Sequence, residues 1–280
     1  MAFVNVSVYV PEAGMNINVD MVFPNDRRWK AEAGDIKGVI TLLHGFYGCG
    51  EDWLRLTAAG RYAYDSGYLL ICPGAGNSFY HNMAYGPPWY DIITEFLPRE
   101  LNSIFKIPVE REINHIAGLS MGGYGAMRIG LSSPDRYATI GAFSGALDLA
   151  VLAAIAGKAP EARSFFTPVL GESLTLPGEA DLLKLVAKEA ERSRSLGQRV
   201  FVTCGKQDEL SHRVYTQNQN FLKAAKNTPL DFTYREWDGL HEWQFWDRSL
   251  AEYIGFIEKS DYGAQRRGNW LSEEQGFTNT

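Results

Sequence analysis

The stretch HIAGLSMGGYGAM, from His115 to Met127, carries the strongest structural signal in the sequence. Its first half is an apolar run typical of a buried strand, and its second half has the spacing of a helix. Between the two halves, Ser120 stands in the pattern Gly-x-Ser-x-Gly, flanked by Gly118 and Gly122. Glycine has no Cβ and so allows backbone segments to approach closely. The stretch therefore predicts a sharp strand-to-helix turn with a serine at its apex.

A serine in such a turn is typical of the nucleophile elbow of α/β hydrolases, where a strained backbone exposes the hydroxyl group above the sheet. The N-terminus of the following helix favours developing negative charge there. The alternative is a glycine-rich turn with an incidental serine, but the strand-like and helix-like flanks favour the elbow. Neither Gly-x-Gly-x-x-Gly nor a phosphate-loop pattern occurs, which argues against a nucleotide site.

Short apolar runs recur along the chain and predict strands. Two runs alternate in polarity and predict an opening antiparallel pair, Phe3–Val10 and Asn16–Phe23. Continuous runs suit strands buried on both faces of a parallel sheet, and these are Gly38–Gly45, Tyr68–Gly74, Ile113–Ser120, Tyr137–Gly145 and Arg199–Gly205. A last strand is predicted at Asp231–Trp237.

Helical spacing fills the intervals between these runs, at Trp89–Phe105, Met121–Leu131, Leu182–Arg194, Arg213–Lys226 and Trp243–Ile257. Pro98 is expected to break or restart the first of these helices. The alternation predicts a doubly wound α/β fold, with helices on both faces of a mostly parallel sheet. We expect one domain over residues 1–260, with a small cap or rim at Leu149–Pro177 and a polar tail at 261–280.

Composition and charge argue against several classes of protein. The chain of 280 residues has a net charge of −6 and no long basic run, so we expect neither a nucleic-acid nor a membrane partner. The N-terminus alternates in polarity and does not resemble a signal peptide. Cys49, Cys72 and Cys204 have no Cys-x-x-Cys spacing, which predicts no metal site and a reducing, cytoplasmic setting. Whether the chain forms a homo-oligomer stays open.

A serine hydroxyl is a weak nucleophile without a base, and in α/β hydrolases the chain order is serine, acid, histidine. Only His212 and His241 follow Ser120. His241 lies between the last predicted strand and the last predicted helix, where the base of this fold belongs. His212 fits a surface or capping role better. Phe245 occupies the position of the second histidine in His-Glu-x-x-His, so the zinc-protease motif is absent.

The candidate acid is Asp208, just after the predicted strand Arg199–Gly205, where its carboxylate could orient the imidazole of His241. Glu209 is the neighbouring alternative. Asp148 follows a different strand and fits a helix cap or a loop anchor.

The developing oxyanion needs two donors. The backbone N–H of Met121, next after the serine, is one candidate, and that of Phe46, in the loop after the predicted strand Gly38–Gly45, is the other. His44 lies beside this loop and is interpreted as a structural residue that organises Gly45–Gly50.

Tyr47 and Trp243 are the candidate substrate-binding residues. Trp243 and Trp246 are three residues apart on a predicted helix, which also favours a core position for this pair. Bulky rings at Phe46 and Tyr47 leave little room beside the oxyanion loop. The sequence therefore predicts a narrow apolar pocket and a preference for acetyl to butyryl esters.

The segments LLHGFYGCGEDWL (42–54), FLPREL (96–101), IAGLSMGGYGAM (116–127), AFSGALD (142–148), CGKQDEL (204–210) and HEWQFWDRSL (241–250) occur in this order. Together they resemble the esterase family that includes esterase D, the S-formylglutathione hydrolases and the antigen 85 proteins, with most similarity to tributyrin-esterase-type carboxylesterases. The resemblance extends from Val4 to Phe256.

This resemblance implies an α/β-hydrolase fold and hydrolysis of carboxylic esters without a cofactor. It implies the same roles for Ser120, Asp208 and His241, and for the N–H groups of Phe46 and Met121. The alternatives are S-formylglutathione hydrolysis, an acetyl-sugar or feruloyl esterase activity, acyl transfer to an alcohol, and a binding module that has lost catalysis.

Overall fold

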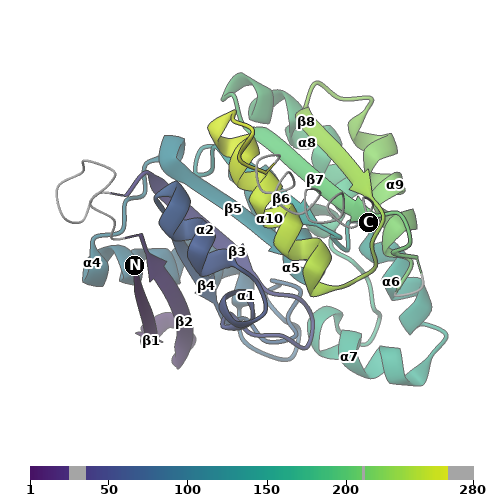
Figure 1. Cartoon of the computed structure of the whole chain (residues 1–280). Helices are drawn as coiled ribbons and strands as arrows, with labels where there is room; N and C mark the ends of the chain where they lie inside the picture. Colours follow the sequence, from purple (N-terminus) through teal and green to yellow (C-terminus); the bar gives the residue numbers. More distant parts are fainter. Residues whose placement is uncertain (25–35, 210–211, 264–280) are drawn as a thin grey trace, which may run out of the picture.

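The computed structural model describes residues 1–24, 36–209 and 212–263. Its strands form one twisted sheet through the middle of the molecule (Figure 1). Across the sheet the order is β1 (Ala2–Val10), β2 (Met15–Phe23), β4 (Tyr68–Pro73), β3 (Gly38–Leu43), β5 (Asn114–Leu119), β6 (Thr139–Phe143), β7 (Arg199–Gly205) and β8 (Asp231–Trp237).

The sheet is mostly parallel, as the apolar patterns predict. β1 and β2 pair in antiparallel fashion, and β2 is antiparallel to β4. The strands from β4 to β8 in the sheet order are parallel to one another. The carboxyl ends of β5, β6, β7 and β8 therefore meet at one edge of the sheet, where loops from distant parts of the sequence come together.

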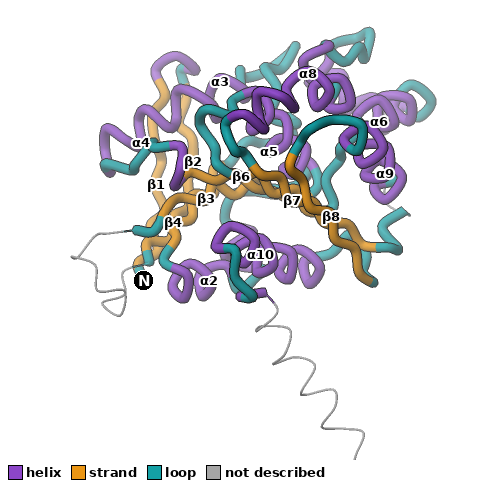
Figure 2. Tube along the Cα trace, turned by 90° about the horizontal axis from the view of Figure 1, so that it is seen from above, coloured by secondary structure: helices purple, strands orange, loops and turns teal. Residues whose placement is uncertain are grey.

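Helices cover both faces of the sheet (Figure 2), which confirms the predicted fold class. One face carries α2 (Ala59–Ser66) and α10 (Trp243–Glu258). The opposite face carries α3 (Trp89–Asp91), α4 (Leu97–Phe105), α5 (Met121–Ser132), α6 (Leu149–Ala156), α8 (Leu182–Ser195) and α9 (Val214–Ala225). Among the described residues, the remaining α-helices are α1 (Asp52–Arg55), which precedes α2, and α7 (Pro160–Leu170), which follows α6.

Buried side chains alternate between the two faces because successive residues of a strand point to opposite sides. In β3, Val39 packs into the core on the α5 side and Ile40 into the core on the α10 side. Val200 and Phe201 of β7 divide in the same way. The continuous apolar runs in the sequence therefore correspond to strands with two buried faces.

The sequence predicts irregularities at two places, the break near Pro98 and the segment 149–177. A π-helical turn, Ile92–Phe96, interrupts the helix predicted at Trp89–Phe105, and Pro98 lies in the first turn of the restarted helix α4. Proline is tolerated there because the first N–H groups of a helix have no intrahelical partner. The segment predicted as a cap or rim contains α6 and α7.

Two further sequence predictions concern the C-terminal tail and membrane association. The polar tail predicted at 261–280 lies outside the described residues from 264 onward, so the boundary at residue 260 stays a prediction. Within the described ranges, no helix is both long and apolar enough to cross a bilayer.

Candidate active site

Ser120 lies at a strained turn between β5 and α5. Its φ of +52° is in a region that L-residues rarely adopt, and its N–H donates to the carbonyl oxygen of Phe143 (2.9 Å). A Cβ on Gly118 would lie 2.4 Å from the carbonyl of Gly122, and a Cβ on Gly122 would lie 2.2 Å from the carbonyl oxygen of Leu43. Both glycines are therefore required by close backbone packing, as the Gly-x-Ser-x-Gly pattern predicts.

The structure joins the three candidate catalytic side chains by hydrogen bonds. Ser120 Oγ lies 2.9 Å from Nε2 of His241, and Nδ1 of His241 lies 2.9 Å from Oδ2 of Asp208. A carboxylate only accepts hydrogen bonds, so the Nδ1–H donates to Asp208 and Nε2 accepts from the serine hydroxyl. The side chain of Asp208 is fully buried, whereas that of His241 is 18% exposed. The resulting relay leads from the interior to an accessible hydroxyl group.

Two hydrogen bonds hold the loop that carries Asp208 against the loop that carries His241. The N–H of Lys206 donates to the carbonyl oxygen of Trp237 (3.0 Å). The N–H of Gly239 donates to Oε1 of Gln207 (2.8 Å). Both contacts connect the ends of β7 and β8, which pair in parallel. The distance between Asp208 and His241 is thus fixed by the sheet edge rather than by the two side chains alone.

The alternative acids have other partners. Glu209 accepts from the N–H and the hydroxyl of Thr216 (2.9 and 2.8 Å) and pairs with Arg213, so it stabilises the first turn of α9. Asp148 accepts from Nδ2 of Asn220 (2.7 Å) at the start of α6. Asp148 therefore serves as the loop anchor that the sequence suggested.

The loop after β3 passes directly beside the serine. A Cβ on Gly45 would lie 3.6 Å from the Cβ of Ser120, which places the Gly45–Phe46 segment next to the hydroxyl group. Among the described residues, the N–H groups of Phe46 and Met121 donate to no protein acceptor. The next amide, that of Tyr47, instead donates to Oδ1 of Asn77 (2.7 Å). The two candidate oxyanion donors are therefore available to a ligand.

The buried side chain of His44 holds this loop in place. Its ring is completely buried, Nε2 accepts from the N–H of Ala75 (2.9 Å), and Nδ1 lies 2.7 Å from the carbonyl oxygen of Gly45. Burial lowers the pKa of His44, which keeps the imidazole neutral as these two bonds require. Its structural role agrees with the interpretation from sequence.

Ser120 opens into a cavity of about 260 Å³, which we call the active-site cavity. Apart from Ser120, His212 and Gln217, the residues that line it are apolar or aromatic. They come from the loops after β3, β4 and β6, from α6 and α7, and from the start of α9. The lining consists of Phe46, Tyr47, Phe79, Ser120, Ala146, Leu152, Ile155, Ala162, Phe165, Phe166, His212, Val214 and Gln217.

The two candidate substrate-binding residues differ in position. Tyr47 lines the active-site cavity and is 70% exposed at its mouth. Trp243 does not line it, because its ring packs edge-on against Trp53 and Trp246 at the start of α10. This corrects the expectation for Trp243, which belongs to the packing of the α10 face.

Sequence reasoning missed most of the cavity wall. Phe165 and Phe166 lie in the 149–177 segment, outside the six motif segments that carry the family resemblance, and helical spacing alone does not distinguish a cavity wall from a core face. His212 was interpreted as a surface residue, and it is exposed, but it also lines the cavity. Partial burial of its ring, and then the neighbouring His241, lower the pKa of His212. Gln217 is completely buried. The one signal in the sequence that could have indicated it is its place in the polar helix that follows Asp208.

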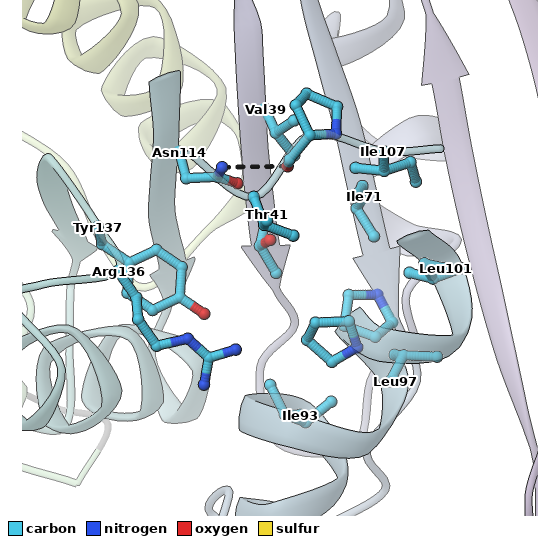
Figure 3. A pocket seen from close by; sticks show the side chains of 14 residues that line it. Val39, Thr41, Ile71, Ile93, Leu97, Leu101, Ile107, Asn114, Arg136 and Tyr137 are labelled. Carbon is cyan, nitrogen blue, oxygen red and sulfur yellow. Dashed lines mark hydrogen bonds between the residues drawn. The ribbon is translucent and has the colours of Figure 1, made fainter. Parts of the chain in front are cut away.

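A second cavity lies between β3, β4 and α4 (Figure 3). It measures about 70 Å³ and has mainly apolar walls, including Val39, Ile71 and Leu101. At its rim, Nδ2 of Asn114 donates to the carbonyl oxygen of Pro108 (3.1 Å). None of the candidate catalytic side chains lines this cavity. In the described ranges, no group of three or more His, Cys, Asp and Glu side chains is arranged to hold a metal ion.

The eight-stranded sheet with helices on both faces and a serine at the turn after β5 defines an α/β hydrolase. The family described as "Putative esterase" matches residues 11–257, and the chain belongs to this family. An acetyl esterase of Caldicellulosiruptor saccharolyticus is 28% identical over 271 residues, which cover 92% of this chain and 99% of the relative.

Solved structures agree with this family. The fluorophosphonate-binding serine hydrolase FphF of Staphylococcus aureus is 27% identical, with a TM-score of 0.79 over 91% of this chain and 98% of that one. The S-formylglutathione hydrolase FrmB of the same organism is 25% identical, with a TM-score of 0.74 over the same shares. The protein is thus a serine hydrolase that acts on carboxylic esters.

Proposed function

We propose that Ser120 is the nucleophile of a carboxylesterase that hydrolyses short-chain acyl esters, from acetyl to butyryl. The observation that carries this proposal is the hydrogen-bond relay from Asp208 through His241 to Ser120, which ends in an apolar cavity. His241 removes the hydroxyl proton as Ser120 attacks the ester carbonyl, and Asp208 stabilises the imidazolium that forms.

The N–H groups of Phe46 and Met121 then hold the oxyanion of the tetrahedral intermediate. His241 protonates the departing alcohol, which leaves an acyl group on Ser120. Water releases the acid by the reverse route, and His241 serves again as base and then as acid. All these steps use groups of the chain and the substrate, with no cofactor.

The cavity wall supports neutral ester substrates of limited size. The described residues that line it include no lysine or arginine, so they provide no counter-ion for the carboxylates of a glutathione thioester. Aromatic rings of the loop after β3 bound the space beside Ser120, as the narrow-pocket hypothesis requires. We further propose a cytoplasmic location without nucleic-acid or membrane partners, supported by the net charge of −6 and three free thiols.

A series of p-nitrophenyl esters with two to twelve carbons tests the proposal. We expect kcat/KM to be highest between acetyl and butyryl and to decline for octanoyl and longer chains, because a closed pocket cannot bury further methylenes. A maximum at eight carbons or beyond would contradict the narrow pocket. S-formylglutathione and methyl ferulate are the comparison substrates, and a clear preference for either would replace the short-chain assignment.

A further inference from the structure

Five aromatic rings form a continuous chain where the α6–α7 segment meets the loops after β3 and β4. Phe165 of α7 contacts Phe46 and Tyr47 edge-on, with ring centroids 5.7 and 5.6 Å apart. Phe166, the next residue, contacts Phe79 (5.2 Å), and Phe79 contacts Phe46 (5.5 Å). All five rings line the active-site cavity, so this chain of contacts forms one of its walls.

The five rings differ in how much of their surface is exposed to solvent. Phe79 is 5% exposed and is the most buried of the five rings. Phe165 is 39% exposed and Tyr47 is 70% exposed, so the contact between them lies at the outer end. Gly45 lies beside Ser120, and Phe165 contacts the ring of the next residue, Phe46. A group that extends from the serine past Phe46 toward the exposed end of the wall therefore meets Phe165.

The base of the α6–α7 segment is attached to α9. Gln217, which is completely buried, accepts through Oε1 from the backbone N–H of Asp148 (3.2 Å). Nδ2 of Asn220 donates to the carboxylate of the same aspartate (2.7 Å). These two bonds hold the residue from which α6 begins.

The far end of the segment is attached as well. The N–H of Ala84 donates to the carbonyl oxygen of Val169 (3.1 Å), and the N–H of Tyr85 donates to that of Pro168 (2.9 Å). Because both ends are hydrogen-bonded to the rest of the fold, α7 presents Phe165 as part of a formed wall rather than as a freely swinging lid.

We infer that Phe165 is the residue that limits the length of the acyl chain, an inference that rests on the proposed function. Its ring closes the outer end of a wall whose inner rings are already packed, and Leu152 and Ile155 of α6 continue the apolar lining beside it. Replacement of the ring by a methyl group opens this end while the attachments of α7 are retained. Additional methylenes of a longer acyl chain are then buried, each contributing roughly fourfold to kcat/KM.

The test compares kcat/KM for p-nitrophenyl acetate, butyrate and octanoate in four proteins: wild type, Phe165→Ala, Phe165→Trp and Phe3→Ala. Phe3 is an exposed phenylalanine on the edge strand β1, far from the cavity, and serves as the matched control. In Phe165→Ala, the ratio of kcat/KM for octanoate to kcat/KM for butyrate is expected to rise about tenfold or more. Four fully buried methylenes would raise this ratio by roughly 200-fold. Phe165→Trp is expected to lower the ratio of butyrate to acetate, and Phe3→Ala to leave both ratios unchanged.

An octanoate-to-butyrate ratio in Phe165→Ala equal to that of an active wild type would overturn the inference and leave the proposed function intact. A wild type that hydrolyses none of the three esters would instead refute the proposed function. Should Phe165→Ala fail to fold, Phe165→Leu provides the same comparison with a smaller opening, and an unchanged ratio there is equally decisive against the inference.

Discussion

Replacing Asp208 with asparagine is expected to lower kcat by about 10⁴-fold while preserving the fold. The carboxylate is fully buried, and its bond to Nδ1 of His241 (2.9 Å) is the one side-chain hydrogen bond that the described residues give it. An asparagine that turns its amide nitrogen toward Nδ1 donates instead of accepting. The imidazole proton then lies on Nε2, which can no longer accept the proton of Ser120. The expected loss corresponds to about 5 kcal/mol of transition-state stabilisation.

Initial rates with p-nitrophenyl acetate measure this loss, and circular dichroism checks the fold. The loss is expected in kcat rather than in KM, because the carboxylate is buried behind the histidine and does not line the active-site cavity. Glu209→Gln is the matched control, since this neighbouring carboxylate binds the start of α9 and is expected to keep near-wild-type rates. If Asp208→Asn retained a tenth of the wild-type kcat, or if Glu209→Gln were the more damaging change, the assignment of the acid would be refuted.

Two further predictions concern stability. Gly122→Ala places a Cβ 2.2 Å from a backbone oxygen of β3 and is expected to reduce the free energy of unfolding by about 1–3 kcal/mol, whereas an unchanged urea midpoint would contradict the close packing. Burial lowers the pKa of His81 and His115 to about 3 in the folded protein, against 6.5 for a free imidazole. The unfolded chain therefore gains protons first, and stability is expected to fall as the pH drops from 6.5 toward 3, by up to about 1.4 kcal/mol per pH unit per histidine. Urea unfolding at pH 7.5 and 5.0 measures this decline, and equal free energies would contradict it.

Local backbone requirements made the central part of the fold predictable from sequence. The turn at Ser120 requires residues without a side chain at positions 118 and 122, and the two glycines there are visible in the sequence. The buried parallel strands appear as continuous apolar runs because both of their faces are covered. Helix α2 was not predicted, since its eight residues are too few to show a reliable period and pack through Tyr62 and Ala63 onto the sheet.

The sequence favours Asp208 over Glu209, but the contacts that distinguish these two neighbours are seen only in the structure. Asp208 and Glu209 are adjacent carboxylates, and only the path of the loop after β7 directs one toward His241 and the other toward α9. The position of Trp243 in the sequence is consistent with either substrate binding or packing, and in the structure its partly buried ring packs against Trp53. Such distinctions depend on tertiary contacts that a periodic pattern does not encode.

The cavity wall was the least predictable part of the site. Phe165 and Phe166 are consecutive residues of a helix in the 149–177 segment, and nothing in their spacing indicates that two loops 80 to 120 residues earlier pack against them. A cavity is space left between elements, so its shape follows from how α6 and α7 are attached at both ends rather than from any single motif.

The most direct test of the account is whether Ser120 is the residue that becomes covalently modified during turnover. A fluorophosphonate probe with the native protein, followed by mass spectrometry of the digested chain, is expected to show modification of Ser120 and of no other serine, with heat-denatured protein as the unreactive control. Ser120→Ala is expected to lose both the labelling and about 10⁶-fold in kcat while keeping its circular dichroism spectrum. Labelling of another serine, or a tenth of the wild-type activity in pure Ser120→Ala, would contradict the central claim.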